Sequence, residues 1–228
     1  MHDVSQALSH TVPTWETILR GRNGMLVAGA ALGGFGLLFT LVKARRSEAI
    51  DVAITLQVQA QKHPTVAQLM EVVSWPGFPP QSRIIPPLAM ATMYVMGLRT
   101  EAAFQLLAWG TGGVSTVVKG FIRRPRPLPE QVRVVLAPLG GSSFPSGHVL
   151  TYVGTYGFMA FLVYSVIRPP HVRWPLSMGL LGLVALVGPS RIYQGHHWPT
   201  DVASSYLLGT AYLIGLMALY RRVKGRQA

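Results

Sequence analysis

Cysteine is absent from this 228-residue chain, and charged side chains are scarce. Without cysteine the protein can form no disulfide framework, no thiolate nucleophile and no zinc–thiolate site. Only 12% of the residues are charged, whereas soluble domains carry about 25%. Because 50% of the residues are hydrophobic, this deficit of charge predicts a protein that exposes much of its surface to lipid.

Acidic residues are the rarest charged group. The chain has 8 Asp and Glu against 20 Lys and Arg, which gives a formal net charge of +12. Such an excess suits nucleic acid, anionic lipid headgroups or phosphorylated substrates. The high apolar content and the lack of any nucleic-acid-binding motif argue against nucleic acid, so the other two partner classes remain. Nothing in the sequence indicates an oligomeric state.

Long uncharged runs are abundant. Residues 24–42 form a run of 19, about the length that crosses a bilayer as a helix. No signal-peptidase site follows this run, so we expect an uncleaved span behind a tail of residues 1–23. Five further spans are expected at residues 84–98, 102–118, 149–167, 174–189 and 202–220. The predicted fold class is therefore an all-α, polytopic membrane helical bundle of about six transmembrane helices, in one domain over residues 1–228.

The segment 44–82 differs from these runs because it carries charges. Ile50, Ile54 and Val58, and then Val66, Leu69 and Val73, recur at helical spacing. The pattern predicts one or two interfacial amphipathic helices at the membrane surface, between the first and second spans. We expect a break near Pro64 and an end at "WPGFPP". A soluble connector is the alternative.

Three polar clusters lie in the links that follow the third and fifth expected spans. Six spans place both termini on one side of the membrane, so the links after the third and fifth spans share the opposite side. These links contain "KGFIRRPRP" at 119–127, "PSGH" at 145–148 and "SRIYQGHHWPTD" at 190–201. We therefore expect the three clusters to meet on one face of the membrane.

Each cluster alone has an ordinary explanation. The basic run can anchor a helix to lipid headgroups. Ser146 can cap a helix, and His148 alone is most simply a capping or interfacial histidine. His197 and Asp201 lie four residues apart on one helical face, where a structural hydrogen bond is common, and with His196 they could also bind a metal.

Together, the clusters contain the parts of a phosphate site. Arginine offers forked donors to phosphate oxygens, and the N–H groups of a helix start attract anions. Two histidines and a carboxylate complete acid–base and nucleophilic machinery. The phosphate-binding candidates are Lys119, Arg126, Ser146, Gly147 and Arg191, and the catalytic candidates are His148, His197 and Asp201.

The clusters resemble the three motifs of the type-2 phosphatidic acid phosphatase (PAP2) superfamily. That family shows a lysine, six residues and Arg-Pro; then Pro-Ser-Gly-His; then Ser-Arg, five residues, a histidine, three residues and an aspartate. All three motifs match in residue type, spacing and order between residues 119 and 201.

The resemblance implies a phosphatase that works through a phosphohistidine. His197 would attack phosphorus, and Asp201 would hold the other ring nitrogen of His197. His148 would protonate the leaving oxygen and then activate the water. Because Lys119, Arg126 and Arg191 would neutralise the phosphate, we expect no metal and no cofactor.

The expected substrate is a membrane lipid phosphate, either a phosphomonoester or a pyrophosphate. Phosphatidic acid, phosphatidylglycerol phosphate, isoprenyl pyrophosphate, lipid A phosphate and even a soluble sugar phosphate all fit the motifs. The expected location is a cell membrane, as a multi-pass protein of the bacterial inner membrane with its active site on the periplasmic or extracellular face. The alternatives are a lipid-binding or lipid-moving protein without catalysis, and a metal transporter that uses His148, His196, His197 and Asp201.

Overall fold

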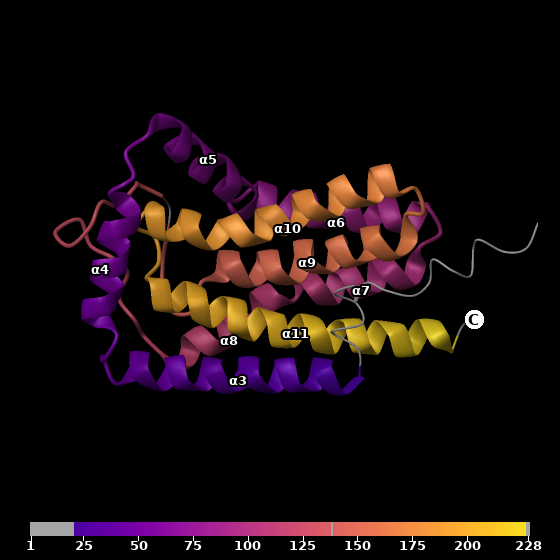
Figure 1. Ribbon diagram of the computed structural model, residues 1–228, viewed down its shortest axis with the longest axis horizontal. Helices are drawn as coiled ribbons and strands as arrows, with labels where there is room; N and C mark the ends of the chain where they lie inside the picture. The colour runs from indigo at the N-terminus through magenta and orange to yellow at the C-terminus, as the bar shows by residue number, and fades with distance from the viewer. Residues whose placement is uncertain (1–20, 138, 227–228) are drawn as a thin grey trace, which may run out of the picture.

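The computed structural model describes residues 21–137 and 139–226, and within these ranges every regular element is helical (Figure 1). The helices are α3 (Gly21–Lys43), α4 (Glu48–Gln59), α5 (Pro64–Ser74), the 3-10 turn η1 (Trp75–Gly77), α6 (Gln81–Val95), α7 (Arg99–Trp109), α8 (Thr111–Phe121), α9 (Gly147–Val166), α10 (Pro170–Tyr193) and α11 (Pro199–Gly225). The all-α prediction is confirmed. Of the expected N-terminal tail, residues 1–20 lie outside the described residues, and residues 21–23 belong to α3.

Four helices are long and apolar enough to cross a bilayer, namely α3, α9, α10 and α11. Their mean hydropathy lies between 1.4 and 2.1 over the most apolar window of each helix. They coincide with the spans expected at 24–42, 149–167, 174–189 and 202–220. The chain is thus a multi-pass membrane protein, and four of the six expected spans are helices of sufficient length.

The count of six spans is not confirmed, because the second and third expected spans are short or divided. The 15 residues of α6 extend over about 22 Å, less than the roughly 30 Å of a hydrocarbon core. Gly97 ends this helix, since its positive φ of 80° lets the N–H of Leu98 reach the carbonyl of Met93. The sequence expectation extended this segment to residue 98, past that turn.

The segment 102–118 is divided at Gly110 into α7 and α8, each of 11 residues. The N–H of Gly110 bonds the carbonyls of both Leu106 and Leu107, and the Thr111 hydroxyl donates to the carbonyl of Ala108 at 2.9 Å. These bonds satisfy the polar groups that the break releases. The break itself packs directly on Gly154 of α9.

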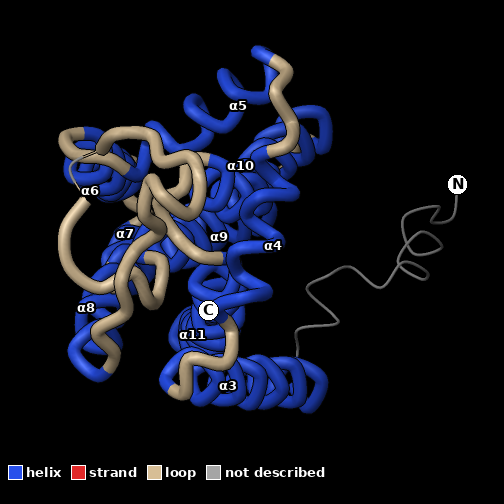
Figure 2. Tube along the Cα trace, turned by 90° about the vertical axis from the view of Figure 1, so that its left-hand side faces the viewer, coloured by secondary structure: helices blue, strands red, loops and turns tan. Residues whose placement is uncertain are grey.

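Helix α9 lies at the centre of the bundle, between α10 and α11, and α3 runs along the outer side of α11 (Figure 1). Twelve of its 20 residues are buried, so this helix contributes to both large apolar clusters. At one end of the bundle α8 and α10 end while α9 and α11 begin, and α4 crosses this end (Figure 1). Figure 2 looks onto the same end and shows the loops gathered there.

The segment 44–82, where one or two helices were expected, forms two helices with a break just before Pro64. The buried residues of α4 are the polar Asp51, Thr55 and Gln59. Ile50 is 56% exposed and Ile54 is 36% exposed on the outer side. The polar side faces inward because it has partners there. The location of α4 and α5 at the membrane surface stays a prediction.

The contact between α9 and the α7–α8 break predicts an effect on stability. A methyl group on Gly154 would lie 2.4 Å from the carbonyl oxygen of Ala108 and 2.5 Å from Thr111 Oγ1. Backbone atoms cannot move aside cheaply, so Gly154→Ala should destabilise the protein by about 1–3 kcal/mol. The measurement is thermal unfolding in detergent. The matched control is Gly179→Ala in α10, where a methyl group meets nothing within 4 Å, and equal unfolding temperatures for the two variants would contradict this packing.

Candidate active site

The three motifs meet at the end of the bundle where α4 and the loops lie. Helix ends present each group there: α8 and α10 carry cations in their last turns, and α9 and α11 carry polar residues in their first turns. The predicted residues are Lys119 on α8, Arg126 in the following loop, Ser146, Gly147 and His148 at the start of α9, Arg191 on α10, His197 in the next link, and Asp201 on α11.

A cavity of about 380 Å³ opens among these residues, and Lys119, Arg126, Gly147, His148 and His197 all line it. The lining of the cavity therefore combines cations with both histidines of the motifs. Behind this lining, Ser146, Arg191 and Asp201 have no exposed surface. The structure thus brings all eight predicted residues to one place.

The hydrogen bonds of His197 determine its tautomer. Nδ1 lies 2.8 Å from the carbonyl oxygen of Ser143, which can only accept, so Nδ1 carries the hydrogen. Nε2 lies 3.2 Å from Nη1 of Arg126, which can only donate, so Nε2 holds the lone pair. The lone pair of Nε2 therefore faces the cavity side of the ring, as a nucleophile requires.

Asp201 is arranged differently from the expectation. Its Oδ2 is 3.7 Å from His197 Nδ1, too far for a hydrogen bond. Instead, the carboxylate accepts hydrogen bonds from the Ser143 hydroxyl, from the backbone N–H of Trp198 and from the guanidinium of Arg124. The Nδ1–H of His197 instead donates to the Ser143 carbonyl, and Asp201 holds Ser143 through its hydroxyl.

Several buried polar atoms around the cavity have no partner among the described residues. They are Arg126 Nε, Arg191 Nε and Nη2, His148 Nε2, and the hydroxyls of Ser115 and Ser146. Ser146 occupies the N-cap position of α9, yet its side chain makes no capping bond, contrary to the structural role considered from sequence. Because buried polar groups are normally hydrogen-bonded, this set indicates a site for an anion with several oxygens.

The local charges also favour an anion in the cavity. Burial lowers the pKa of Lys119, and the neighbouring positive charge of Arg126 lowers it further. Burial also lowers the pKa of His197 to about 4; Arg126 and Arg191 lower it further, while Asp201 opposes them. The imidazole of His197 is neutral at pH 7, and an anion in the cavity would relieve the repulsion among the cations.

His196, whose role the sequence left open, faces away from this cavity. Its Nε2 lies 2.7 Å from the carbonyl of Val135, so it holds the loop that crosses the end of the bundle. It lines a separate cavity with Val135 and Gln194. Within residues 21–137 and 139–226, no three His, Asp or Glu side chains are placed to hold a metal ion together.

The structure adds residues that the motifs do not contain. The Ser74 hydroxyl accepts a hydrogen bond from Arg191, and the Phe78 ring lies 4.8 Å from the Arg191 guanidinium and 4.7 Å from the His148 ring. No spacing in the sequence links this segment to the motifs. Ser115 also lines the cavity, and its position four residues before Lys119 on the same helical face was a usable signal.

Comparisons with known proteins agree with the motifs. The family model of the PAP2 superfamily matches residues 101–224, more than half of the chain. Undecaprenyl-diphosphatase BcrC of Bacillus subtilis (strain 168) is 29% identical over 136 residues, which are 57% of this chain and 64% of that protein, just under two thirds of its length. Phosphatidylglycerophosphatase B of the same organism is 26% identical over 182 residues, 77% of this chain and 85% of that protein.

A solved structure shows that the fold is shared. The crystal structure of a transmembrane PAP2 type phosphatidylglycerolphosphate phosphatase from Bacillus subtilis superposes with a TM-score of 0.75 at 22% sequence identity. The superposition covers 86% of this chain and 96% of that one. The two proteins therefore share a fold.

The buried histidines predict how stability depends on pH. Burial lowers the pKa of His196 to about 3 and that of His197 to about 4, from an ordinary value of 6.5. The unfolded chain therefore binds more protons below pH 6.5, and stability should fall as the pH drops from 6.5 towards 4. His196→Gln should make this slope shallower, by at most about 1.4 kcal/mol per pH unit.

The measurement is thermal unfolding in detergent between pH 6.5 and 4.5. His171→Gln serves as the matched substitution at an exposed histidine, at the start of α10. Identical slopes for the wild type and His196→Gln would contradict the burial of a neutral imidazole at this position.

Proposed function

The chain belongs to the PAP2 superfamily, and from that premise we propose that it is an integral-membrane phosphatase that hydrolyses a lipid phosphate through a phosphohistidine. The substrate carries a phosphomonoester or a diphosphate on a lipid. One observation supports this proposal most directly: the unpartnered Nε of Arg126, the unpartnered Nε2 of His148 and the lone pair of His197 gather at one cavity. The buried Arg191, which has unpartnered donors of its own, packs on the same Phe78 ring as His148.

In the first step, Nε2 of His197 attacks phosphorus in line with the departing oxygen. The lone pair of Nε2 forms the N–P bond while the P–O bond to the leaving group breaks. His148 donates its proton to the leaving oxygen, so the lipid departs as an alcohol or, from a diphosphate, as a lipid monophosphate. Arg126 gives up its contact with Nε2 to donate to the phosphate oxygens, where negative charge spreads.

In the second step, His148 accepts a proton from water, and the resulting hydroxide attacks phosphorus. The N–P bond breaks, inorganic phosphate leaves, and its electron pair returns to Nε2 of His197. The hydrogen on Nδ1 stays bonded to the Ser143 carbonyl, which supports the positive charge that the ring carries while it is phosphorylated.

The position of the cavity supports a lipid as the substrate. The cavity lies at the end of a bundle whose long helices are apolar on the outside, so a headgroup can enter while the hydrocarbon tail stays in the bilayer. Two of the relatives are named for a lipid diphosphate and for a phosphatidylglycerol phosphate. Both chemistries present a terminal phosphate on a lipid, and we propose that this shared group is what the site recognises.

We expect phosphate release to depend on both motif histidines and on no divalent metal. With detergent-purified protein, lipid phosphomonoesters and diphosphates, and excess EDTA, His197→Ala should abolish turnover. His148→Ala should reduce kcat by roughly 10²–10⁴-fold, the usual contribution of acid–base catalysis. His171→Gln is the control and should retain full activity. Full activity in His197→Ala, or activity that EDTA removes and Mg²⁺ or Zn²⁺ restores, would contradict the mechanism.

The proposed orientation places both termini in the cytoplasm and the cavity on the outer face of the cell membrane. Because the chain lacks cysteine, single introduced thiols can be labelled without background. Leu136→Cys lies in the loop beside the site, where the side chain is 98% exposed, and Arg226→Cys follows α11. An impermeant thiol reagent added to intact cells should label position 136 and not position 226. The reverse pattern would invert the orientation.

A further inference from the structure

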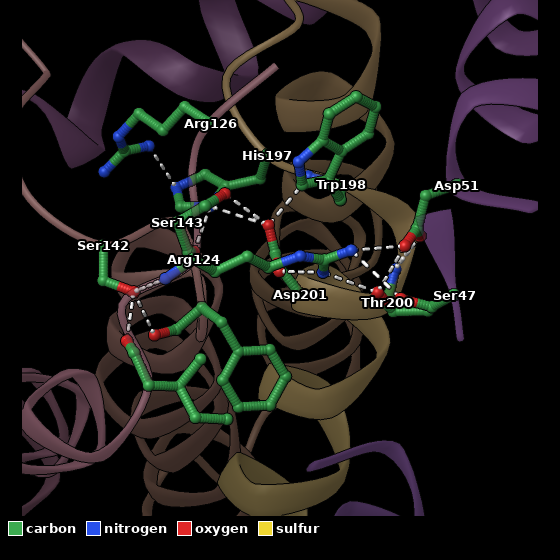
Figure 3. A network of polar contacts seen from close by, with 12 residues as sticks. Ser47, Asp51, Arg124, Arg126, Ser142, Ser143, His197, Trp198, Thr200 and Asp201 are labelled. Carbon is green, nitrogen blue, oxygen red and sulfur yellow. Dashed lines mark hydrogen bonds and ion pairs between the residues drawn. The ribbon is translucent and has the colours of Figure 1, made fainter. Parts of the chain in front are cut away.

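Arg124 lies two residues before Arg126 in the basic run, but its surroundings are entirely different. Its side chain is buried, and both ends of its guanidinium bind carboxylates (Figure 3). Nη1 donates to Asp201 Oδ1 and to Thr200 Oγ1 at 2.7 Å. Nη2 donates to Asp51 Oδ2 and to the Ser47 hydroxyl at 3.1 Å. Arg124 is therefore not available to a phosphate in the cavity.

The two carboxylates come from distant parts of the chain. Asp51 is on α4, is 1% exposed, and also accepts hydrogen bonds from the N–H and the hydroxyl of Thr200 at 2.9 Å. Asp201 is on α11 and has no exposed surface. A buried charge is costly unless it is paired and hydrogen-bonded, so the three charged groups can be buried only together.

Ser143 connects Arg124 and Asp201 to His197, the proposed nucleophile. The N–H of Ser143 donates to the carbonyl of Arg124 at 2.9 Å, and its hydroxyl donates to Asp201 Oδ2. Its carbonyl accepts the Nδ1 hydrogen of His197 at 2.8 Å. Arg124 thus acts on Ser143 twice, once through its own backbone and once through Asp201 (Figure 3).

From these contacts we propose that Arg124 and Asp51 are positioning residues for the nucleophile. The chain of contacts Asp51–Arg124–Asp201–Ser143–His197 holds the imidazole in the Nδ1–H tautomer and aims Nε2 at phosphorus. Through this chain of contacts, the position of α4 affects the orientation of the His197 ring. The proposal rests on the proposed phosphatase function, and it assigns a catalytic consequence to a helix that contains no motif residue.

The test separates positioning from mere stabilisation. Asp51→Asn keeps the shape of the side chain and removes the charge that holds Nη2. Because small misplacements of reacting groups are costly, kcat for lipid phosphate hydrolysis should fall roughly 10- to 100-fold, with KM changed by less than about 3-fold. Arg124→Gln should lower kcat at least as much. The double variant should resemble Arg124→Gln alone, since both changes break the same chain of contacts.

The matched control lies at the opposite end of α11. Lys224 pairs with the buried carboxylate of Glu101 at 2.8 Å, so Lys224→Gln also removes the partner of a buried acid. We expect Lys224→Gln to lower the unfolding temperature and leave kcat unchanged. If Asp51→Asn behaves in the same way, with lower stability and unchanged kcat, the positioning role is overturned. Multiplying effects in the double variant would overturn the shared chain.

Two further measurements keep the outcomes distinct. If Asp51→Asn does not fold, Ser47→Ala takes its place, because it removes one bond to Nη2 and leaves every charge. This variant should lower kcat by roughly 2- to 10-fold at constant KM, and an unchanged kcat overturns the proposal. Wild-type protein without any phosphatase activity would refute the proposed function itself, whereas active wild type with fully active Asp51→Asn would refute only the positioning role.

Discussion

The carboxylate of Asp201, which has no exposed surface, is the group on which the arrangement of the site depends. It accepts hydrogen bonds from Arg124, Ser143 and the N–H of Trp198. Arg124 and Ser143 lie near the two ends of the link between α8 and α9, and Trp198 lies just before α11. Since an unsatisfied buried carboxylate would be strongly unfavourable, the start of α11 is stable in this position only with the link between α8 and α9 packed against it. The hydrogen bonds of this one acid therefore tie together the segments that carry the motifs.

The arginines at this end of the bundle differ in whether their hydrogen-bond acceptors are charged or neutral. Arg124 binds two carboxylates, so its charge is neutralised within the protein. Among the described residues, Arg126 binds the carbonyls of His196 and Gly140 and the ring of His197, and Arg191 binds the neutral side chains of Ser74 and Gln194. Neutral acceptors leave the positive charge uncompensated. Arg126 and Arg191 are therefore suited to binding an anionic ligand, whereas Arg124 is suited to holding the structure around the site.

The inverted polarity of α4 has the same electrostatic origin. Asp51 turns inward because Arg124 and Thr200 bind it there, and Gln59 turns inward to bind the carbonyls of Arg133 and Tyr193 at 2.7 Å and 3.1 Å. The apolar side is then left outward, as at Ile50. In water such a helix would be unfavourable, but it suits a position against lipid, where burying polar side chains inward and exposing apolar ones outward are both favourable.

Local periodicity and composition were sufficient to predict the long helices and the positions of the motifs. Long uncharged runs such as 24–42 must be helices in a membrane, because only a helix satisfies its own backbone there. Motif spacing also placed His197 and Asp201 near one another, since four residues span one helical turn. The eight predicted site residues and their convergence at one end of the bundle were accessible in this way. The ends of α6 and the division of the segment 102–118 were harder to predict from the sequence, because the turns at Gly97 and Gly110 interrupt runs that are apolar enough to continue as helices.

The tertiary structure alone decided which partner each polar group takes. Arg124 and Arg126 are the same residue type in the same basic run, yet one is neutralised by Asp51, 73 residues away along the chain, and the other faces the cavity. Periodicity places Asp201 beside His197, but it cannot show that the Ser143 carbonyl, 54 residues from the ring, takes the Nδ1 hydrogen. Hydrogen bonds act over about 3 Å, so their pairing is settled by which distant segments pack together, and the local sequence contains no record of that packing.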